Sequence, residues 1–140
     1  MKKVKSILVP LDGSKNSFRA LDFAITLAKP INASITGIHC IDLQLVLEYA
    51  VIDPVSIRLE KKAHQFLKTA KKNCAKNRIE FKQKILRGKT SEKILQFSKK
   101  GKFDLIVMGS KGEGMVQEML LGSVSHEITH RSKIPVVIVR

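Results

Sequence analysis

The sequence predicts an α/β fold: an open, doubly wound, five-stranded parallel sheet in the strand order 3-2-1-4-5, with helices on both faces. Two apolar runs, residues 7–11 (ILVPL) and 103–108 (FDLIVM, with Asp104 as its one polar residue), are typical of strands buried on both faces. Strand-like and helix-like segments alternate along the chain, which favours parallel strands joined by crossover helices. With 140 residues, 44% of them hydrophobic, residues 1–140 are expected to form a single domain with its own core.

The first strand is followed by a predicted helix. Ser14 or Asn16 is suited to cap its start, and Pro30 is expected to stop it after about residue 29. Its apolar residues at helical spacing are Phe18, Leu21, Ile25 and Ala28. The second strand is expected at residues 33–41.

The middle of the chain is less regular. Residues 43–54 have no clear period, so we expect a loop or a short helical excursion there, closed by Pro54. A helix is expected from about residue 55 to 76. Its predicted inner stripe consists of Leu59, Ala63, Phe66, Ala70 and Cys74. Residues 79–86 alternate between apolar and charged, which indicates a strand with one wet face at an edge of the sheet.

The last third of the chain repeats the pattern of helix and strand. Thr90 or Ser91 is suited to cap a helix over residues 92–100, whose inward residues are expected to be Ile94, Leu95 and Phe97. A strand at 103–108, a helix at 123–130 and a strand at 135–139 complete the fold. In this strand order ligands bind between the carboxyl ends of the first and fourth strands, where Asp12 and Gly109 stand.

The charge of the chain is concentrated in one segment. The formal net charge is +14, and residues 58–102 contain 16 lysines and arginines against three glutamates. This segment is either a docking surface for an acidic partner or nucleic acid, or a solvated lysine-rich surface. Its phenylalanines fall at core-type positions, so stacking on nucleic-acid bases is not expected.

Composition also bears on location. No apolar run approaches the roughly 20 residues that span a bilayer, so no membrane association is expected. Cys40 and Cys74 lie in apolar-periodic segments and are expected to be buried, reduced thiols. A cytoplasmic location is therefore expected.

A glycine-rich stretch follows the fourth predicted strand. Its spacing is Gly109-x2-Gly112-x9-Gly122-Ser123. Glycines let the backbone approach an anion, and the N–H groups at a helix start point toward it, so a phosphate cradle is predicted. Two better-known phosphate loops do not fit: the order of these glycines is not G-x-G-x-x-G, and residues 88–90 (GKT) lack the P-loop glycine because Gln83 stands there.

With the opening P-x-D-G-S of residues 10–14, this glycine spacing makes the chain resemble the universal stress protein family, in its ATP-binding subgroup, from end to end. The resemblance implies an adenine nucleotide alpha hydrolase-like fold. It also implies a nucleotide-responsive regulatory module in stress response that binds ATP, or ADP or AMP, together with Mg²⁺.

The resemblance further implies a role for each site residue. Asp12 would hydrogen-bond the ribose or the adenine, beside a wall formed by Pro10 and Leu11, and Ile41 would pack on the adenine face. Met108 and Gly109 would lie under the ribose, and Gly112 would approach the phosphates. Backbone and hydroxyl hydrogen bonds to the phosphates would come from Gly122, Ser123 and Val124. Many relatives carry a basic residue where this chain has Glu113, so the preference among nucleotides is open, although Lys111 is suited to compensate.

Catalysis is not predicted. No Ser–His–Asp set or carboxylate pair converges on Asp12, so a binding module is expected and ATP hydrolysis is not. Residues 126–130 match H-E-x-x-H, which on a helix can hold zinc for hydrolysis, but the remaining histidines lie in other elements and we interpret the match as accidental. A phosphoacceptor receiver domain is excluded because the third strand ends without a carboxylate.

Two further expectations concern partners. The last strand, Val136–Val139, is short, apolar and at a sheet edge, so a homodimer through this edge is predicted. The alternative function is a nucleotide-independent interaction protein that docks acidic partners through residues 58–102.

Overall fold

The computed structural model describes residues 2–42, 52–112 and 121–140. Its five strands form one parallel sheet in the order β3-β2-β1-β4-β5, which confirms the predicted order. The elements are β1 (Ser6–Pro10), α1 (Lys15–Ile31), β2 (Ser34–Ile41), α3 (Ile52–Lys76), β3 (Phe81–Arg87), α4 (Thr90–Lys100), β4 (Leu105–Gly109), α5 (Ser123–Arg131) and β5 (Val136–Val139).

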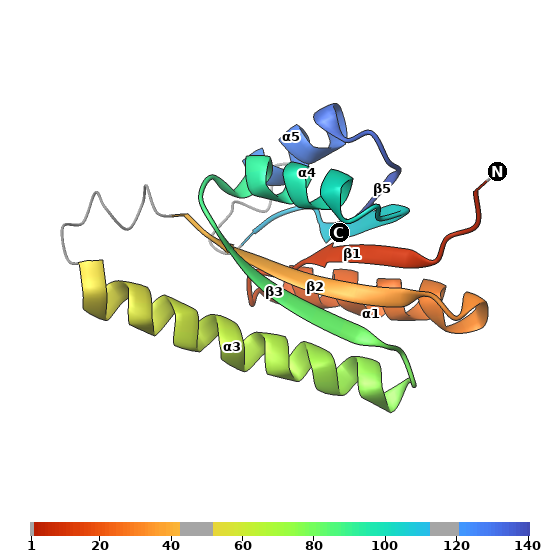
Figure 1. Ribbon diagram of the computed structural model, residues 1–140, viewed down its shortest axis with the longest axis horizontal. Helices are drawn as coiled ribbons and strands as arrows, with labels where there is room; N and C mark the ends of the chain where they lie inside the picture. Colours follow the sequence, from red (N-terminus) through yellow and green to blue (C-terminus); the bar gives the residue numbers. More distant parts are fainter. Residues whose placement is uncertain (1, 43–51, 113–120) are drawn as a thin grey trace.

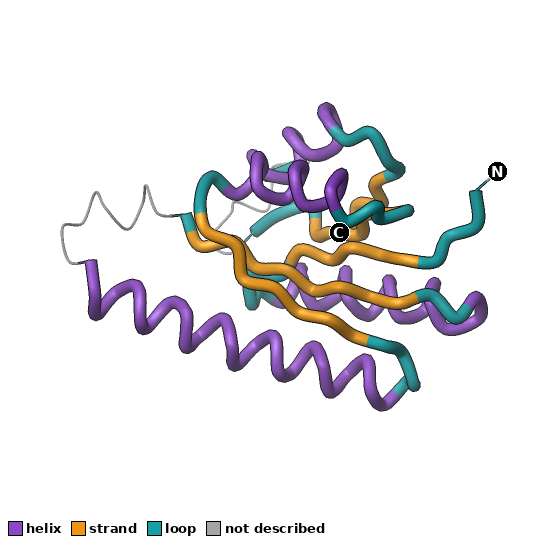
Figure 2. The backbone as a smooth tube through the Cα atoms, in the orientation of Figure 1, coloured by secondary structure: helices purple, strands orange, loops and turns teal. Residues whose placement is uncertain are grey.

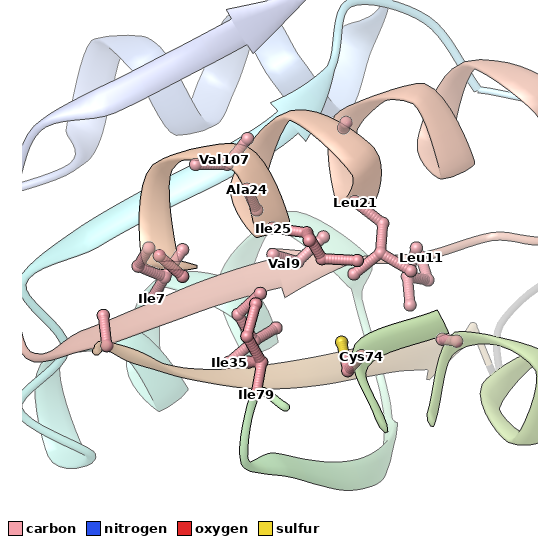
Figure 3. Packing of buried hydrophobic residues seen from close by; sticks show 14 of the residues in the cluster. Ile7, Val9, Leu11, Leu21, Ala24, Ile25, Ile35, Cys74, Ile79 and Val107 are labelled. Carbon is pink, nitrogen blue, oxygen red and sulfur yellow. The ribbon is translucent and has the colours of Figure 1, made fainter. Parts of the chain in front are cut away.

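Helices cover both faces of the sheet, with α1 and α3 on one face and α4 and α5 on the other (Figures 1 and 2). The buried side chains divide in the same way. Ile7 and Val9 of β1 pack with α1 and α3, whereas Leu8 between them packs with α4 and α5. Strand side chains alternate between the two faces, so both faces of β1 are fully buried. Figure 3 shows the cluster between the sheet, α1 and α3.

Helix α1 begins where the sequence analysis predicted, but it ends later than predicted. Ser14 is the N-cap, and its hydroxyl accepts the Ser17 N–H at 3.1 Å. The helix continues through Pro30 to Ile31. A proline in the last turn removes a single N–H, and the helix ends only where Asn32 takes a left-handed conformation with φ 54°.

Helix α3 begins at Ile52, earlier than predicted, and the expected loop over residues 43–54 lies outside the described residues up to position 51. Its inner stripe is also partly different. Leu59 is 37% exposed, and Leu67 is fully buried in line with Ala63. Both leucines fit a helical period, and the docking angle of the helix decides which of them is covered.

Two smaller predictions were wrong. Neither Thr90 nor Ser91 caps α4, because Thr90 is already its first residue and the N-cap, Lys89, makes no side-chain cap bond. Cys40 is half-buried rather than buried, because it stands near the carboxyl end of β2 beside the cleft described below. Strand β3 lies at the edge of the sheet, as predicted. No helix in the described part of the chain has the length and apolar character needed to cross a membrane.

Candidate functional site

A cleft of about 380 Å³ opens at the carboxyl ends of β1 and β4. Its walls come from the end of β1, the end of β2, the loop after β4 and the first turn of α5. Nine of the ten predicted site residues line it: Pro10, Leu11, Asp12, Met108, Gly109, Gly112, Gly122, Ser123 and Val124. The topology therefore brings together two sequence segments that are about a hundred residues apart.

Ile41 is the tenth predicted residue, and the structure does not bring it to the cleft. Its side chain is 2% exposed, and its carbonyl accepts the Gly88 N–H at 3.0 Å. The residues of β2 that line the cleft are Ile38, His39 and Cys40.

Asp12 is held by the turn that follows β1. Its Oδ1 accepts the Ser14 N–H at 2.9 Å. The other carboxylate oxygen lies close to the backbone of Gly112, where an added Cβ would stand 3.0 Å from it. A glycine at this position lets the loop after β4 approach the carboxylate.

The Asn16 side chain joins two segments beside the cleft by hydrogen bonds, a role that was not predicted from the sequence. Its Oδ1 accepts the Lys111 N–H at 2.9 Å, and its Nδ2 donates to the Val139 carbonyl at 3.1 Å. A Cβ on Gly109 would stand 2.4 Å from Asn16 Oδ1. One amide side chain in the first turn of α1 thus positions both the loop after β4 and the end of β5.

The first turn of α5 presents backbone donors to the cleft. Its N-cap, Gly122, makes no side-chain cap bond, and no acidic residue lies in the first turn. The Gly122 N–H donates to the Ser110 carbonyl at 2.7 Å, which corrects the expectation that this group donates to a phosphate. The next donors at the positive end of the helix belong to Ser123 and Val124, and such an end favours an anion.

Ser125 fixes this turn in place. Its hydroxyl contacts the Ser110 carbonyl at 2.7 Å and the Gly122 carbonyl at 3.1 Å. The start of α5 is therefore joined to the end of β4 by side-chain and backbone bonds. Such preorganisation lowers the entropic cost of binding an anion.

His39 is a neutral ring in the wall of the cleft. Its Nδ1 lies 2.8 Å from the Leu11 carbonyl, and its ring meets Phe66 edge-on at a centroid distance of 5.0 Å. Burial lowers the pKa of His39 below its usual value. A carbonyl can only accept a hydrogen bond, so Nδ1 carries the ring proton.

Several lining residues were not predicted, among them Ser17, Thr90, Ile94 and Ser125. Thr90 belongs to the Gly-Lys-Thr sequence of residues 88–90, which was set aside because the P-loop glycine is missing. The others stand on helices, and their approach to the cleft depends on how those helices dock against the sheet.

The cleft has the size and mixed chemistry of a small-molecule site. Its volume lies in the range of small-molecule sites, with apolar side chains such as Leu11, Ile38 and Met108 for a base and helix N–H groups for phosphates. Asp12 is the one acidic side chain among the described lining residues, and no cluster of three metal-ligating side chains occurs in the described ranges. Any Mg²⁺ here would take its ligands from phosphate oxygens and water, with Asp12 within the same cleft.

The H-E-x-x-H match has a structural explanation. The Glu127 carboxylate accepts the Ser91 hydroxyl at 2.7 Å and the Arg131 guanidinium at 2.8 Å, so it ties α5 to α4. These two bonds, the first being the stronger effect, hold the pKa of Glu127 below its usual value. His126 and His130 stack on the exposed side of α5.

Comparisons with known proteins agree with the fold. The model of the universal stress protein family matches residues 3–140. The universal stress protein YxiE of Bacillus subtilis is 33% identical over 144 residues, covering 96% of this chain and 97% of that protein. The structure of the hypothetical protein MJ0577 is 26% identical with a TM-score of 0.87, covering 96% and 94% of the two chains. A universal stress protein in complex with cAMP is 25% identical with a TM-score of 0.72, covering 97% and 96%.

Proposed function

This chain belongs to the universal stress protein family, and on that premise we propose that its cleft binds an adenine nucleotide, with Mg–ATP as the principal ligand. The proposed role is that of a cytoplasmic, nucleotide-responsive regulatory module in stress response. The observation that carries the proposal is the convergence of Asp12, the glycine loop and the uncapped start of α5 around one cleft.

Each part of the ligand has a counterpart in the wall. Leu11, Ile38 and Met108 offer apolar surface to the base. Asp12 offers carboxylate oxygens to the ribose hydroxyls. A carboxylate that accepts hydrogen bonds from two hydroxyls favours ribose over a sugar ring that lacks them. The N–H groups of Ser123 and Val124 and the Ser123 hydroxyl offer donors to the phosphates.

The similar structure in complex with cAMP supports the adenine nucleotide class, since it is a member of the same family that covers nearly the whole chain. Lys111, which lines the cleft, adds a positive charge on the phosphate side. Glu113 and the rest of residues 113–120 lie outside the described residues, so its expected effect on nucleotide preference stays a prediction.

We further propose that the module binds without rapid turnover, because His39 bonds the Leu11 carbonyl rather than a hydroxyl or thiol of the described lining residues, among which Asp12 is the one carboxylate. Nucleotide in the cleft would change a surface that partners recognise.

A homodimer through β5 is the proposed assembly. Strand β5 lies at one edge of the sheet. The Val139 carbonyl accepts the Ser110 N–H, and the carbonyl of Pro135, the residue before the strand, accepts the Ile106 N–H, so both point toward β4. Backbone groups alternate in direction along a strand, so those of Val136 and Ile138 face outward and are available to a second copy. Sedimentation equilibrium should give the mass of a dimer; a monomer at every concentration would contradict this assembly.

The nucleotide proposal is tested by mass spectrometry of the ligand released from undialysed protein, together with calorimetric titration of ATP. Gly122→Val places an isopropyl group at the N-cap and Ser123→Ala removes one hydroxyl; we expect the first to abolish binding and the second to weaken it about tenfold. Ser132→Ala, outside the cleft, is the matched control and should bind as the wild type does. Absence of a released nucleotide and of heat at millimolar ATP would reject the proposal.

A further inference from the structure

A second cavity, of about 460 Å³, lies at the amino ends of the strands, opposite to the cleft. Its lining residues come from the second half of α4 and the segment before β4, and from the end of α5 and the segment before β5. Lys2, from the segment before β1, completes it, on the side where the N-terminus lies in Figure 1. We call this cavity the basic groove. Its cationic residues are Lys2, Lys99, Lys102, Arg131 and Lys133.

The basic groove has an apolar floor and a positive rim. Leu95, Phe103 and Ile134 form the floor, and the described lining residues include no aspartate or glutamate. Five cations therefore surround a surface that water solvates poorly. Such a combination favours an anionic partner that also carries an apolar group.

Two of the five cations already have acidic partners. The Arg131 guanidinium contacts Glu127 at 2.8 Å, and Lys2 Nζ lies 3.1 Å from Asp104. Lys99, Lys102 and Lys133 make no ion pair or side-chain hydrogen bond with any residue in the described ranges, and all three are exposed.

Helix C-termini explain only part of this charge. A lysine or arginine in the last turn of a helix is favoured by the helix dipole, which accounts for Lys99 and Arg131. Lys102 and Lys133 lie beyond the helices. Lys102 also has a left-handed backbone with φ 54°, a conformation in which asparagine or glycine costs less than lysine.

We propose that the basic groove docks an acidic segment of a partner protein, with carboxylates on the lysine rim and one apolar side chain on the floor. Nucleic acid fits less well, because the Phe103 side chain is 7% exposed and offers no free ring face for base stacking. A single phosphate fits less well too, because the three unpaired lysines stand on α4, after α4 and after α5 around a cavity of about 460 Å³, which is larger than one phosphate group needs.

The groove does not depend on the nucleotide cleft. The cleft uses the first turn of α5 and the groove uses its last residue, Arg131. A variant of the groove should therefore leave ATP binding unchanged, so the failure of one proposal can be told from the failure of the other.

The test uses fluorescence anisotropy with a fluorescein-labelled peptide, Asp-Glu-Glu-Leu-Glu-Glu-Asp, on the full chain. The test variant combines Lys99→Gln, Lys102→Asn and Lys133→Gln; asparagine suits the left-handed position, so folding should be kept. The matched control combines Lys68→Gln, Lys71→Gln and Lys72→Gln on the exposed side of α3, with the same loss of charge. Melting temperature and ATP titration are recorded for both.

We expect the groove variant to weaken peptide binding about tenfold or more and the control about twofold or less. Replacing the central leucine of the peptide by serine should weaken binding several-fold, because the floor then has no apolar partner. The proposal would be overturned if both variants weakened peptide binding equally, or if the peptide bound equally well with leucine and with serine. It would also be overturned by tighter groove binding of an oligothymidine or of tripolyphosphate, or by absence of peptide binding at about 50 mM salt.

Discussion

Replacing Gly109 by alanine tests whether one amide side chain holds the cleft together. The added Cβ would stand 2.4 Å from Asn16 Oδ1, a separation that side chains do not tolerate, so Asn16 must move. The movement breaks the bonds of Asn16 to the Lys111 N–H and the Val139 carbonyl, 2.9 and 3.1 Å long.

The size of the effect follows from these two bonds. An intramolecular hydrogen bond contributes about 0.5–1.5 kcal/mol net, so their loss should lower the free energy of unfolding by about 1–3 kcal/mol. For a domain of this size each kcal/mol lowers the melting temperature by about 3–4 °C. ATP affinity should fall as well, because the loop that carries Lys111 loses its anchor.

A double-mutant cycle with Asn16→Ala isolates the mechanism. Asn16→Ala alone removes the same two bonds, so Gly109→Ala should cost much less in that background than in the wild type. Urea unfolding of the four proteins gives the coupling free energy, expected at about 1 kcal/mol or more. Additive costs would refute the reasoning, since the new methyl group would then act through something other than the Asn16 side chain.

Other predictions concern single side chains. Iodoacetamide should label Cys40, which lines the cleft, more slowly when ATP saturates the protein, as measured by mass spectrometry. Cys74 is buried and burial raises its pKa to about 11, so it should stay unlabelled with or without ATP. If ATP does not change the labelling rate of Cys40, the nucleotide binds elsewhere. The backbone N–H groups of Lys5 and Ser6 donate to Asp104 and lower its pKa, the Lys5 bond having the larger effect, so Asp104→Asn should cost about 1–2 kcal/mol in urea unfolding at pH 7. That cost should shrink as the pH falls from about 4 through the folded-state pKa, and a cost independent of pH would contradict it. Burial lowers the pKa of His39, so unfolding takes up a proton on this ring, and stability should fall as the pH drops from about 6.5 through the folded-state pKa. His39→Gln should remove part of that fall below about pH 6.5; an unchanged slope would show that other groups cause it.

The sequence predicted the architecture well, because hydrophobic period and element order are local properties of the chain. Continuous apolar runs marked the central strands, and alternation in residues 79–86 marked an edge strand, both of which the sheet order confirms. The strand order also brought Asp12 and the glycine loop to one cleft, which explains why nine of the ten predicted residues line it.

Features that depend on packing were less accessible. Asn16 contacts residues 95 and 123 positions away, and nothing in the local sequence distinguishes such a fastening from an ordinary helix cap. Ile41 was expected on the cleft wall, but the path of β2 places Ile38, His39 and Cys40 there. The basic groove likewise forms only where three separate parts of the chain meet, around residues 2, 95–103 and 131–134.

Amide NMR spectra recorded during titration with Mg–ATP would show where on the molecule the nucleotide binds, because each shifted amide reports its own position. If adenine nucleotide binds in the cleft at the carboxyl ends of β1 and β4, the shifts should be concentrated at Gly109, Gly112, Ser123 and Val124. Shifts confined to Lys99, Lys102 and Lys133, or none at millimolar ATP, would contradict it.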